Sequence, residues 1–163
     1  MEPATHMFRL SVALLLVIVA NVAAWAAGHL IPMRWRVPLD GGAVLADRTR
    51  VLGDHKTLAG LIAGTVACGV VAVLFQQSFR LGALFGMLSL VGDCGSSFIK
   101  RRLRLGPGTA VPMLDQLPEA LIPLVAFGPR LGLNAMESIA IALLFSILDL
   151  AMTGLRHPHR LWD

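Results

Sequence analysis

Acidic and basic side chains meet in an unusual place in this sequence, at the end of an apolar stretch. Asp93 belongs to that stretch, and a second acid, Asp115, opens the next one after a turn rich in glycine and proline. Carboxylates among membrane-type apolar residues are costly, and they therefore suggest function. The intervening segment carries hydroxyl and cationic groups, in the order Ser96, Ser97, Lys100, Arg101, Arg102 and Arg104. Cations beside acids suit a ligand with several negative charges, which divalent metal ions could join to the carboxylates.

Helical spacing predicts how these groups are arranged. A helix over residues 81–99 would place both serines and Lys100 on the face that carries Asp93, because residues three, four and seven positions apart share a face. Asp93 would lie about 10 Å from Lys100 along the axis, at 1.5 Å per residue. Acids from two adjacent antiparallel helices could then share one divalent metal ion. The simpler alternatives are an ordinary cluster of cations at a helix end, which leaves Asp93 unexplained, and an N-cap for Asp115.

A second candidate site lies in residues 31–57. Residues 38–42 read Pro-Leu-Asp-Gly-Gly, and residues 52–57 read Leu-Gly-Asp-His-Lys-Thr before the next apolar run. Glycines let the backbone approach a ligand, and Lys56 with Thr57 would offer a cation, a hydroxyl and free N–H groups to an anion. The segment is not a P-loop, because Lys56 follows a histidine rather than a glycine. By itself it is more typical of a solvated turn with a capping threonine.

The composition predicts a membrane protein. Of the 163 residues, 56% are hydrophobic and 15% are charged, which is not typical of a soluble domain. Five apolar runs are visible, at about residues 10–30, 58–75, 81–99, 117–127 and 133–155. A crossing takes about 20 residues, so the fourth run is the weakest. We predict an all-α polytopic membrane protein, with five transmembrane helices in a single integral-membrane domain over residues 1–163.

Positive charges predict the orientation, because cytoplasmic loops are rich in lysine and arginine. Most of the fourteen cations fall in two predicted loops, 31–57 and 100–116, and in the C-terminal tail: Arg34, Arg36, Arg48, Arg50, Lys56, Lys100, Arg101, Arg102, Arg104, Arg156 and Arg160. The opposite side would have only Arg9, Arg80 and Arg130. The sequence therefore predicts the N-terminus outside, the C-terminus and both loops in the cytoplasm, and a place in the cell membrane. The net charge of +4 indicates topology and a phosphate-bearing partner rather than nucleic acid.

Three further polar residues lie within the apolar runs. Asn21 is expected to form a hydrogen bond between helices. Glu119 follows Asp115 by one helical turn and could support the same site. Asp149 could face that site, or it could pair with Arg156.

Residues 93–116 resemble the signature of the CDP-archaeol synthase family, small membrane CTP-dependent cytidylyltransferases distantly related to CDP-diacylglycerol synthases. The pattern is Asp93-x-x-x-Ser97-Phe98-Ile99-Lys100-Arg101-Arg102-Leu103, followed by Gly106, Pro112 and Asp115-Gln116. The match extends upstream to Ala20-Asn21, residues 38–42, 47–48 and 52–57, and Gly60. The resemblance thus covers roughly residues 20–120.

The resemblance implies a five-helix membrane enzyme whose site faces the cytoplasm. Its members transfer CMP from CTP to a lipid phosphate with Mg²⁺ and release pyrophosphate. Asp93, Asp115 and Lys100 would be the catalytic residues, and the two acids would hold the metal. The implied nucleotide- and phosphate-binding residues are Asp40, Gly41, Gly42, Gly53, Asp54, Lys56, Thr57, Ser96, Ser97, Arg101, Arg102 and Gln116. The acceptor would be an archaetidic-acid-like lipid phosphate or phosphatidic acid.

The physical chemistry of the residues agrees with this activity, because phosphate attack on phosphate needs charge neutralisation and alignment more than a base. A CDP-alcohol phosphotransferase is a weaker interpretation, since Asp40-Gly41 lacks the Ala-Arg that this class requires. A non-enzymatic alternative is a membrane subunit or transporter component that binds anionic lipid through its basic loops. Such binding would survive Asp93→Asn and Asp115→Asn.

Overall fold

Five α-helices make up most of the protein, in a computed structural model that describes residues 3–106, 109 and 111–156, without the side chains of residues 3 and 153–156. The helices are α1 (Pro3–Leu30), α2 (Leu58–Leu74), α3 (Phe79–Arg102), α4 (Gln116–Phe127) and α5 (Ala135–Arg156). Two short 3-10 helices, η1 (Met33–Trp35) and η2 (Gly128–Leu131), lie after α1 and α4. The predicted all-α class is confirmed.

Three helices are long and apolar enough to cross a bilayer, at Ala4–Leu30, Phe79–Arg102 and Ala135–Met152. α2 is apolar but has 17 residues, and α4 has 12. Both are shorter than the roughly 20 residues of a perpendicular crossing. Five crossings and the orientation of the chain stay predictions.

α1 begins at Pro3 instead of near residue 10, but the boundary difference that matters for the site concerns α3. This helix ends at Arg102, so Lys100, Arg101 and Arg102 form its last turn instead of starting the loop predicted over residues 100–116. Cations are favourable at this end of a helix, because the unpaired carbonyl groups there carry partial negative charge. The cluster is therefore held on a rigid element, and the connection to α4 begins at Leu103.

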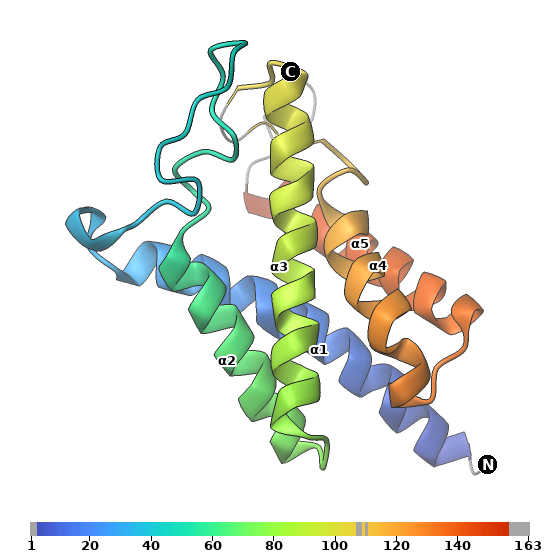
Figure 1. Cartoon of the computed structure of the whole chain (residues 1–163). Coiled ribbons are helices and arrows are strands. Elements are labelled where there is room, and N and C mark those ends of the chain that lie inside the picture. Colours follow the sequence, from blue (N-terminus) through green and yellow to red (C-terminus); the bar gives the residue numbers. More distant parts are fainter. Residues whose placement is uncertain (1–2, 107–108, 110, 157–163) are drawn as a thin grey trace.

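α3 is the central helix of the bundle, with α2 on one side and α4 and α5 on the other (Figure 1). Small residues allow this close packing. A Cβ atom on Gly82 would lie 2.4 Å from the carbonyl oxygen of Cys68 in α2, and one on Gly92 would lie 2.4 Å from that of Pro118 in α4. The buried side chains between the helices include Leu16, Val17, Phe85, Leu124 and Phe145.

The basic loop over residues 31–57 and the connection between α3 and α4 lie at the same end of the bundle, beside the C-terminal end of α3 (Figure 1). Arg102 forms an ion pair with Asp47 of the first loop, at 3.0 Å. Arg80 and Arg130 lie at the opposite end, in the first turn of α3 and in η2. The side chain of Arg156 and all of Arg160 are outside the described residues.

Candidate active site

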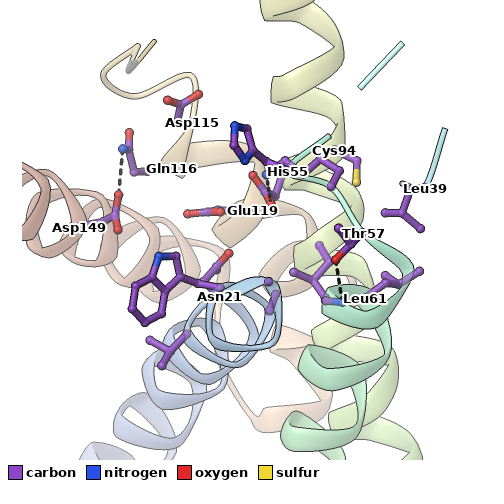
Figure 2. A pocket seen from close by; sticks show the side chains of 18 of the residues that line it. Asn21, Leu39, His55, Thr57, Leu61, Cys94, Asp115, Gln116, Glu119 and Asp149 are labelled. Atoms are coloured by element: carbon purple, nitrogen blue, oxygen red, sulfur yellow. Dashed lines mark hydrogen bonds and ion pairs between the residues drawn. The ribbon is translucent and has the colours of Figure 1, made fainter. Parts of the chain in front are cut away.

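A cavity of about 710 Å³ lies where the loop over residues 31–57 meets the helices. All five α-helices contribute to its lining, and Figure 2 shows polar side chains directed into it from several of them. Its cationic side chains are those of Arg36, Lys56 and Lys100. Its acidic side chains are those of Asp54, Asp93, Asp115, Glu119 and Asp149. The cavity thus combines the charges that a nucleotide and a metal ion require.

Lys56 and Asp93 form the first of two ion pairs in this cavity, through Oδ2 of the aspartate. Lys56 is held just before α2, because its carbonyl oxygen accepts a 2.7 Å hydrogen bond from the backbone of Leu39. The next residue, Thr57, caps α2 by accepting a hydrogen bond from the Gly60 N–H at 3.1 Å. The expected capping role of Thr57 is confirmed, and the cap positions Lys56.

Lys100 and Asp115 form the second pair, with 2.7 Å between Nζ and Oδ1. Lys100 also donates to the Thr109 carbonyl at 3.2 Å, and Oδ2 of Asp115 accepts from the Val111 N–H at 3.1 Å. Asp115 directly precedes α4, but its side chain makes no capping hydrogen bond. Asp115 therefore occupies the N-cap position that one alternative gave it, but its carboxylate pairs with a cation instead of capping the helix.

The predicted site residues divide into two groups. The cavity is lined by Asp54, Lys56, Thr57, Asp93, Lys100, Asp115 and Gln116. The others lie outside its lining: Asp40, Gly41, Gly42, Gly53, Ser96, Ser97, Arg101 and Arg102. The structure therefore brings together the two acids and the two lysines, but it gives the second group different contacts.

Asp40 organises the loop from within. Its side chain is 2% exposed, and it accepts hydrogen bonds from both Arg50 Nη2 (2.7 Å) and Nε (3.3 Å). It also accepts from the backbone N–H groups of Gly42, Leu52 and Gly53 at 3.0 to 3.1 Å. The Arg50 guanidinium holds the pKa of the Asp40 carboxyl well below its usual range. Asp40 thus ties together two parts of the loop instead of facing the cavity.

The glycines of this loop serve its turns. Gly41, Gly42 and Gly53 have φ angles of 56°, 86° and 107°, a region that side chains with a Cβ rarely adopt. None of the three lines the cavity. Their conformation alone accounts for the glycine-rich pattern of residues 41–53.

Arg102 joins the same loop to α3. Its guanidinium lies 3.0 Å from Oδ2 of Asp47 and donates to the Arg50 carbonyl at 2.7 Å. It also lies over the Phe98 ring, 5.0 Å from the centroid. Arg101 donates to the Gly106 carbonyl at 3.0 Å. Both arginines hold backbone segments around the cavity.

Ser96 and Ser97 were expected beside Asp93 on one polar face of α3. Ser96 is 1% exposed and donates to the Asp93 carbonyl at 2.9 Å, and Ser97 is 6% exposed. They are packed within the bundle, whereas Asp93 and Lys100 line the cavity. Residues three or four positions apart share one side of a helix, but that side is wide enough for some of them to line the cavity while others are buried against a neighbouring helix.

The CDP-archaeol synthase family model, described as CarS-like, matches residues 74–155. A CDP-archaeol synthase of Thermofilum pendens is 35% identical over 138 residues, which is 81% of this chain and 68% of the relative. The chain belongs to the CDP-archaeol synthase family. The prediction drawn from residues 20–120 is confirmed.

Other comparisons agree with membership of the CDP-archaeol synthase family. The CDP-archaeol synthase of Aeropyrum pernix is 34% identical over 151 residues, covering 85% of this chain and 83% of the relative. A solved structure, described as an intramembrane enzyme for archaeal membrane lipids biosynthesis, superimposes with a TM-score of 0.69 at 31% identity. The similarity covers 87% of this chain and 90% of that one. The fold is therefore that of a multi-pass intramembrane enzyme.

Several residues that line the cavity have only a weak signal, or none, in the sequence. Asp149 accepts a 3.0 Å hydrogen bond from Gln116 Nε2, so it faces the site. Asn21 lies 3.5 Å from the hydroxyl of Ser89 in α3, as expected for a contact between helices, and it also lines the cavity. Arg36 and His55 line it as well, although nothing in their spacing distinguishes them from ordinary loop residues.

The carboxylates fit a hard divalent cation by chemistry, because Mg²⁺ prefers oxygen ligands. Among the residues that the structure describes, no group of three or more Asp, Glu, His or Cys side chains is arranged to hold a metal by itself. Mg²⁺ is commonly bound by one or two carboxylates together with substrate phosphates. The carboxylates of the cavity therefore suit a Mg²⁺ ion that is bound partly by the protein and partly by the phosphates of a nucleotide.

Proposed function

We propose that this chain transfers CMP from CTP to the phosphate of an archaetidic-acid-like membrane lipid, with Asp93 and Asp115 as its essential acids. The observation that carries the proposal is that both acids line one cavity, each beside a lysine, in a member of the CDP-archaeol synthase family. An oxygen of the lipid phosphate attacks the α-phosphorus of CTP, and the bond to the β-phosphate breaks. The products are a CDP-lipid and pyrophosphate.

The reaction needs charge neutralisation more than it needs a base, since the lipid phosphate is already an anionic nucleophile. Lys56 and Lys100 lie in the cavity with only 22% and 13% of their side chains exposed. Their ammonium groups would exchange carboxylate partners for the phosphates of CTP. Mg²⁺ held by Asp93 and Asp115 would supply further positive charge at the phosphorus under attack.

The apolar part of the cavity supports a membrane lipid as the acceptor. Trp25 of α1 and Leu148 and Met152 of α5 line it, and both helices are of spanning length. A lipid with its chains in the bilayer would reach the polar end of the cavity from this side. The relatives' name favours an archaeol lipid over phosphatidic acid, which remains the competing acceptor.

The proposed topology has five crossings, with the N-terminus outside and the C-terminus, both loops and the cavity on the cytoplasmic side of the cell membrane. Its support is the concentration of arginine and lysine at the loop end of the bundle. α2 and α4 are short for a crossing, so they would require a locally thinner bilayer or flanking polar side chains that reach its surface.

Pyrophosphate release by the detergent-purified full chain tests the proposal. CTP and Mg²⁺ would be supplied with archaetidic acid or with phosphatidic acid, and Asp93→Asn would be compared with Glu137→Gln at the other end of the bundle. We expect lipid-dependent release that prefers CTP and falls at least about 100-fold in Asp93→Asn. Glu137→Gln should stay near the wild-type rate. Lipid binding that follows total anionic charge and survives Asp93→Asn, without any release, would support the non-catalytic alternative instead.

A further inference from the structure

Glu119 is a buried acid for which the described residues supply no hydrogen-bond or ion-pair partner. It is 7% exposed, lies in the first turn of α4 and lines the cavity. Its carboxylate makes no hydrogen bond or ion pair with any residue that the structure describes. Figure 2 shows it directed into the pocket that Asn21, Gln116 and Asp149 also line. Its oxygens are not among the described side-chain atoms that are both sealed from solvent and unpaired, so they open into the cavity, where a cationic ligand can reach them.

The packing of α3 against α4 brings Glu119 close to Asp93. Gly92 forms the contact, because a Cβ atom there would lie 2.8 Å from the Cα of Glu119. Asp93 is the next residue along α3, and its side chain lines the same cavity as that of Glu119. Two carboxylates from two closely packed helices therefore line the same cavity.

The charges around Glu119 leave room for a cation. Asp93, Asp115 and Asp149 line the same cavity as Glu119, and the two lysines of the cavity, Lys56 and Lys100, are paired with Asp93 and Asp115. Asp149 accepts its hydrogen bond from the neutral amide of Gln116. Within the described side chains, neither Glu119 nor Asp149 has a cationic partner. The part of the cavity around Glu119 thus carries an excess of negative charge.

The oxygens that remain available indicate where the cation binds. Both oxygens of Asp115 are engaged, Oδ1 by Lys100 and Oδ2 by the Val111 N–H. In contrast, Oδ1 of Asp93 and both oxygens of Glu119 make no hydrogen bond with a described residue. These three oxygens lie on the wall where α3 meets α4.

We propose that Glu119 is a further carboxylate ligand, beside Asp93, for the divalent cation that accompanies the phosphates of CTP. The inference rests on the proposed function, in which this cation is Mg²⁺ and Asp93 and Asp115 are its ligands. Glu119 adds a ligand from α4 one turn after Asp115. With Asp93 and Asp115, Glu119 would make three carboxylates around the cation, and the nucleotide phosphates would occupy further ligand positions.

Binding of Mn²⁺ tests the inference without any dependence on turnover. Free Mn²⁺ would be counted by electron paramagnetic resonance as it is titrated into the full chain in detergent, with CTP and no lipid. We expect Glu119→Gln to weaken Mn²⁺ binding about tenfold or more, because an isosteric amide removes the charge of one ligand. Glu137→Gln is the matched control, since Glu137 pairs with His6 at the far end of the bundle, and it should bind as the wild type does.

The outcomes separate this inference from the proposed function. If Asp93→Asn loses Mn²⁺ while Glu119→Gln binds it normally, Glu119 is no ligand and the metal centre of the proposed function stands. If wild-type protein with CTP binds no Mn²⁺, both proposals are wrong about the metal. Should Glu119→Gln fail to fold, anomalous diffraction from wild-type crystals grown with Mn²⁺ and CTP decides. A metal peak about 2.0–2.2 Å from a Glu119 oxygen supports the inference, and a peak elsewhere overturns it.

Discussion

Lys56 is joined to Asp93 across 37 residues of sequence, so the end of the first loop is held against the middle of the bundle. The pair remains partly accessible, with 22% of the lysine and 24% of the aspartate side chain exposed. Leaving one charge of such a mostly buried pair without a partner would be costly. We therefore expect a phosphate to replace the carboxylate beside Lys56 while a cation replaces the ammonium group beside Asp93, so that neither charge is left unpaired.

Lys56→Met is expected to raise the KM for CTP about 10- to 100-fold, because hydrogen bonds to charged groups contribute about 1.5–3 kcal/mol. Arg104→Met is the control, since Arg104 is exposed and lies outside the cavity lining. CTP-dependent pyrophosphate release at varied CTP concentrations measures the effect. Equal losses in the two variants would indicate attraction by overall charge instead of a contact at Lys56.

Asp40→Asn is expected to loosen the first loop without touching the cavity. The substitution weakens the hydrogen bonds from Arg50 and from the backbone, at a cost of about 1–3 kcal/mol. Asp54→Asn is a matched control for stability, because Asp54 pairs with the same arginine but its side chain is 78% exposed. Exposed pairs contribute little, so thermal unfolding should show a clearly lower midpoint for Asp40→Asn alone. Equal midpoints would show that Asp40 does not organise the loop.

The difference in stability between the wild type and Asp40→Asn should depend on pH in a definite direction. Arg50 lowers the pKa of Asp40 in the folded protein below its unfolded value of about 4. A lowered pKa stabilises the fold at every pH above the unfolded value, and the contribution is lost as the pH falls through the folded one. We expect the gap between wild type and Asp40→Asn to be constant from about pH 5 to 8 and to shrink in stronger acid. A gap that widens in acid would contradict this assignment.

Arg102→Lys should release the loop from α3, although the charge is kept. The arginine contacts Asp47, the Arg50 carbonyl and the Phe98 ring at once, and an ammonium group cannot reproduce that planar geometry. We expect faster proteolysis within residues 31–57 and a several-fold higher KM for CTP, with kcat little changed. Arg104→Lys should leave proteolysis unchanged. A higher KM with normal proteolysis would mean that Arg102 contacts the nucleotide directly.

The helices could be predicted from the sequence because each coincides with an apolar run, although α1 begins before its run and α3 continues beyond its run to Arg102. The run at 58–75 corresponds to α2 at Leu58–Leu74, and the run at 117–127 to α4 at Gln116–Phe127. The acids could be found as well, since Asp93 and Asp115 are conspicuous next to apolar residues. The loop was less predictable, because Asp40 bonds to groups 10 to 13 residues away in a segment without periodicity.

Long-range contacts explain why other residues lie where the sequence did not predict them. The backbone partner of Arg102 is 52 residues distant, and no local pattern indicates it. Ser96 and Ser97 are buried because of the rotation of α3 against its neighbours, which a spacing of three or four does not fix. Glu119 was noticed only as a neighbour of Asp115, since its closeness to Asp93 depends on the contact at Gly92.

Gly92→Ala tests that contact directly. The new methyl group would lie 2.4 Å from the Pro118 carbonyl oxygen, so α3 and α4 would have to separate, at a cost of about 1–3 kcal/mol. Gly95→Ala is the control on the same helix, because a Cβ atom there meets nothing within 4 Å, and alanine favours a helix over glycine by up to about 1 kcal/mol. Thermal unfolding in detergent should therefore shift in opposite directions for the two variants. Pyrophosphate release should fall only in Gly92→Ala, because the acids on α3 and α4 would no longer face the same ligand. If both alanine variants were equally stable and active, the helices would be farther apart at Gly92 than the structure places them, and Glu119 would be too distant from Asp93 to share a cation.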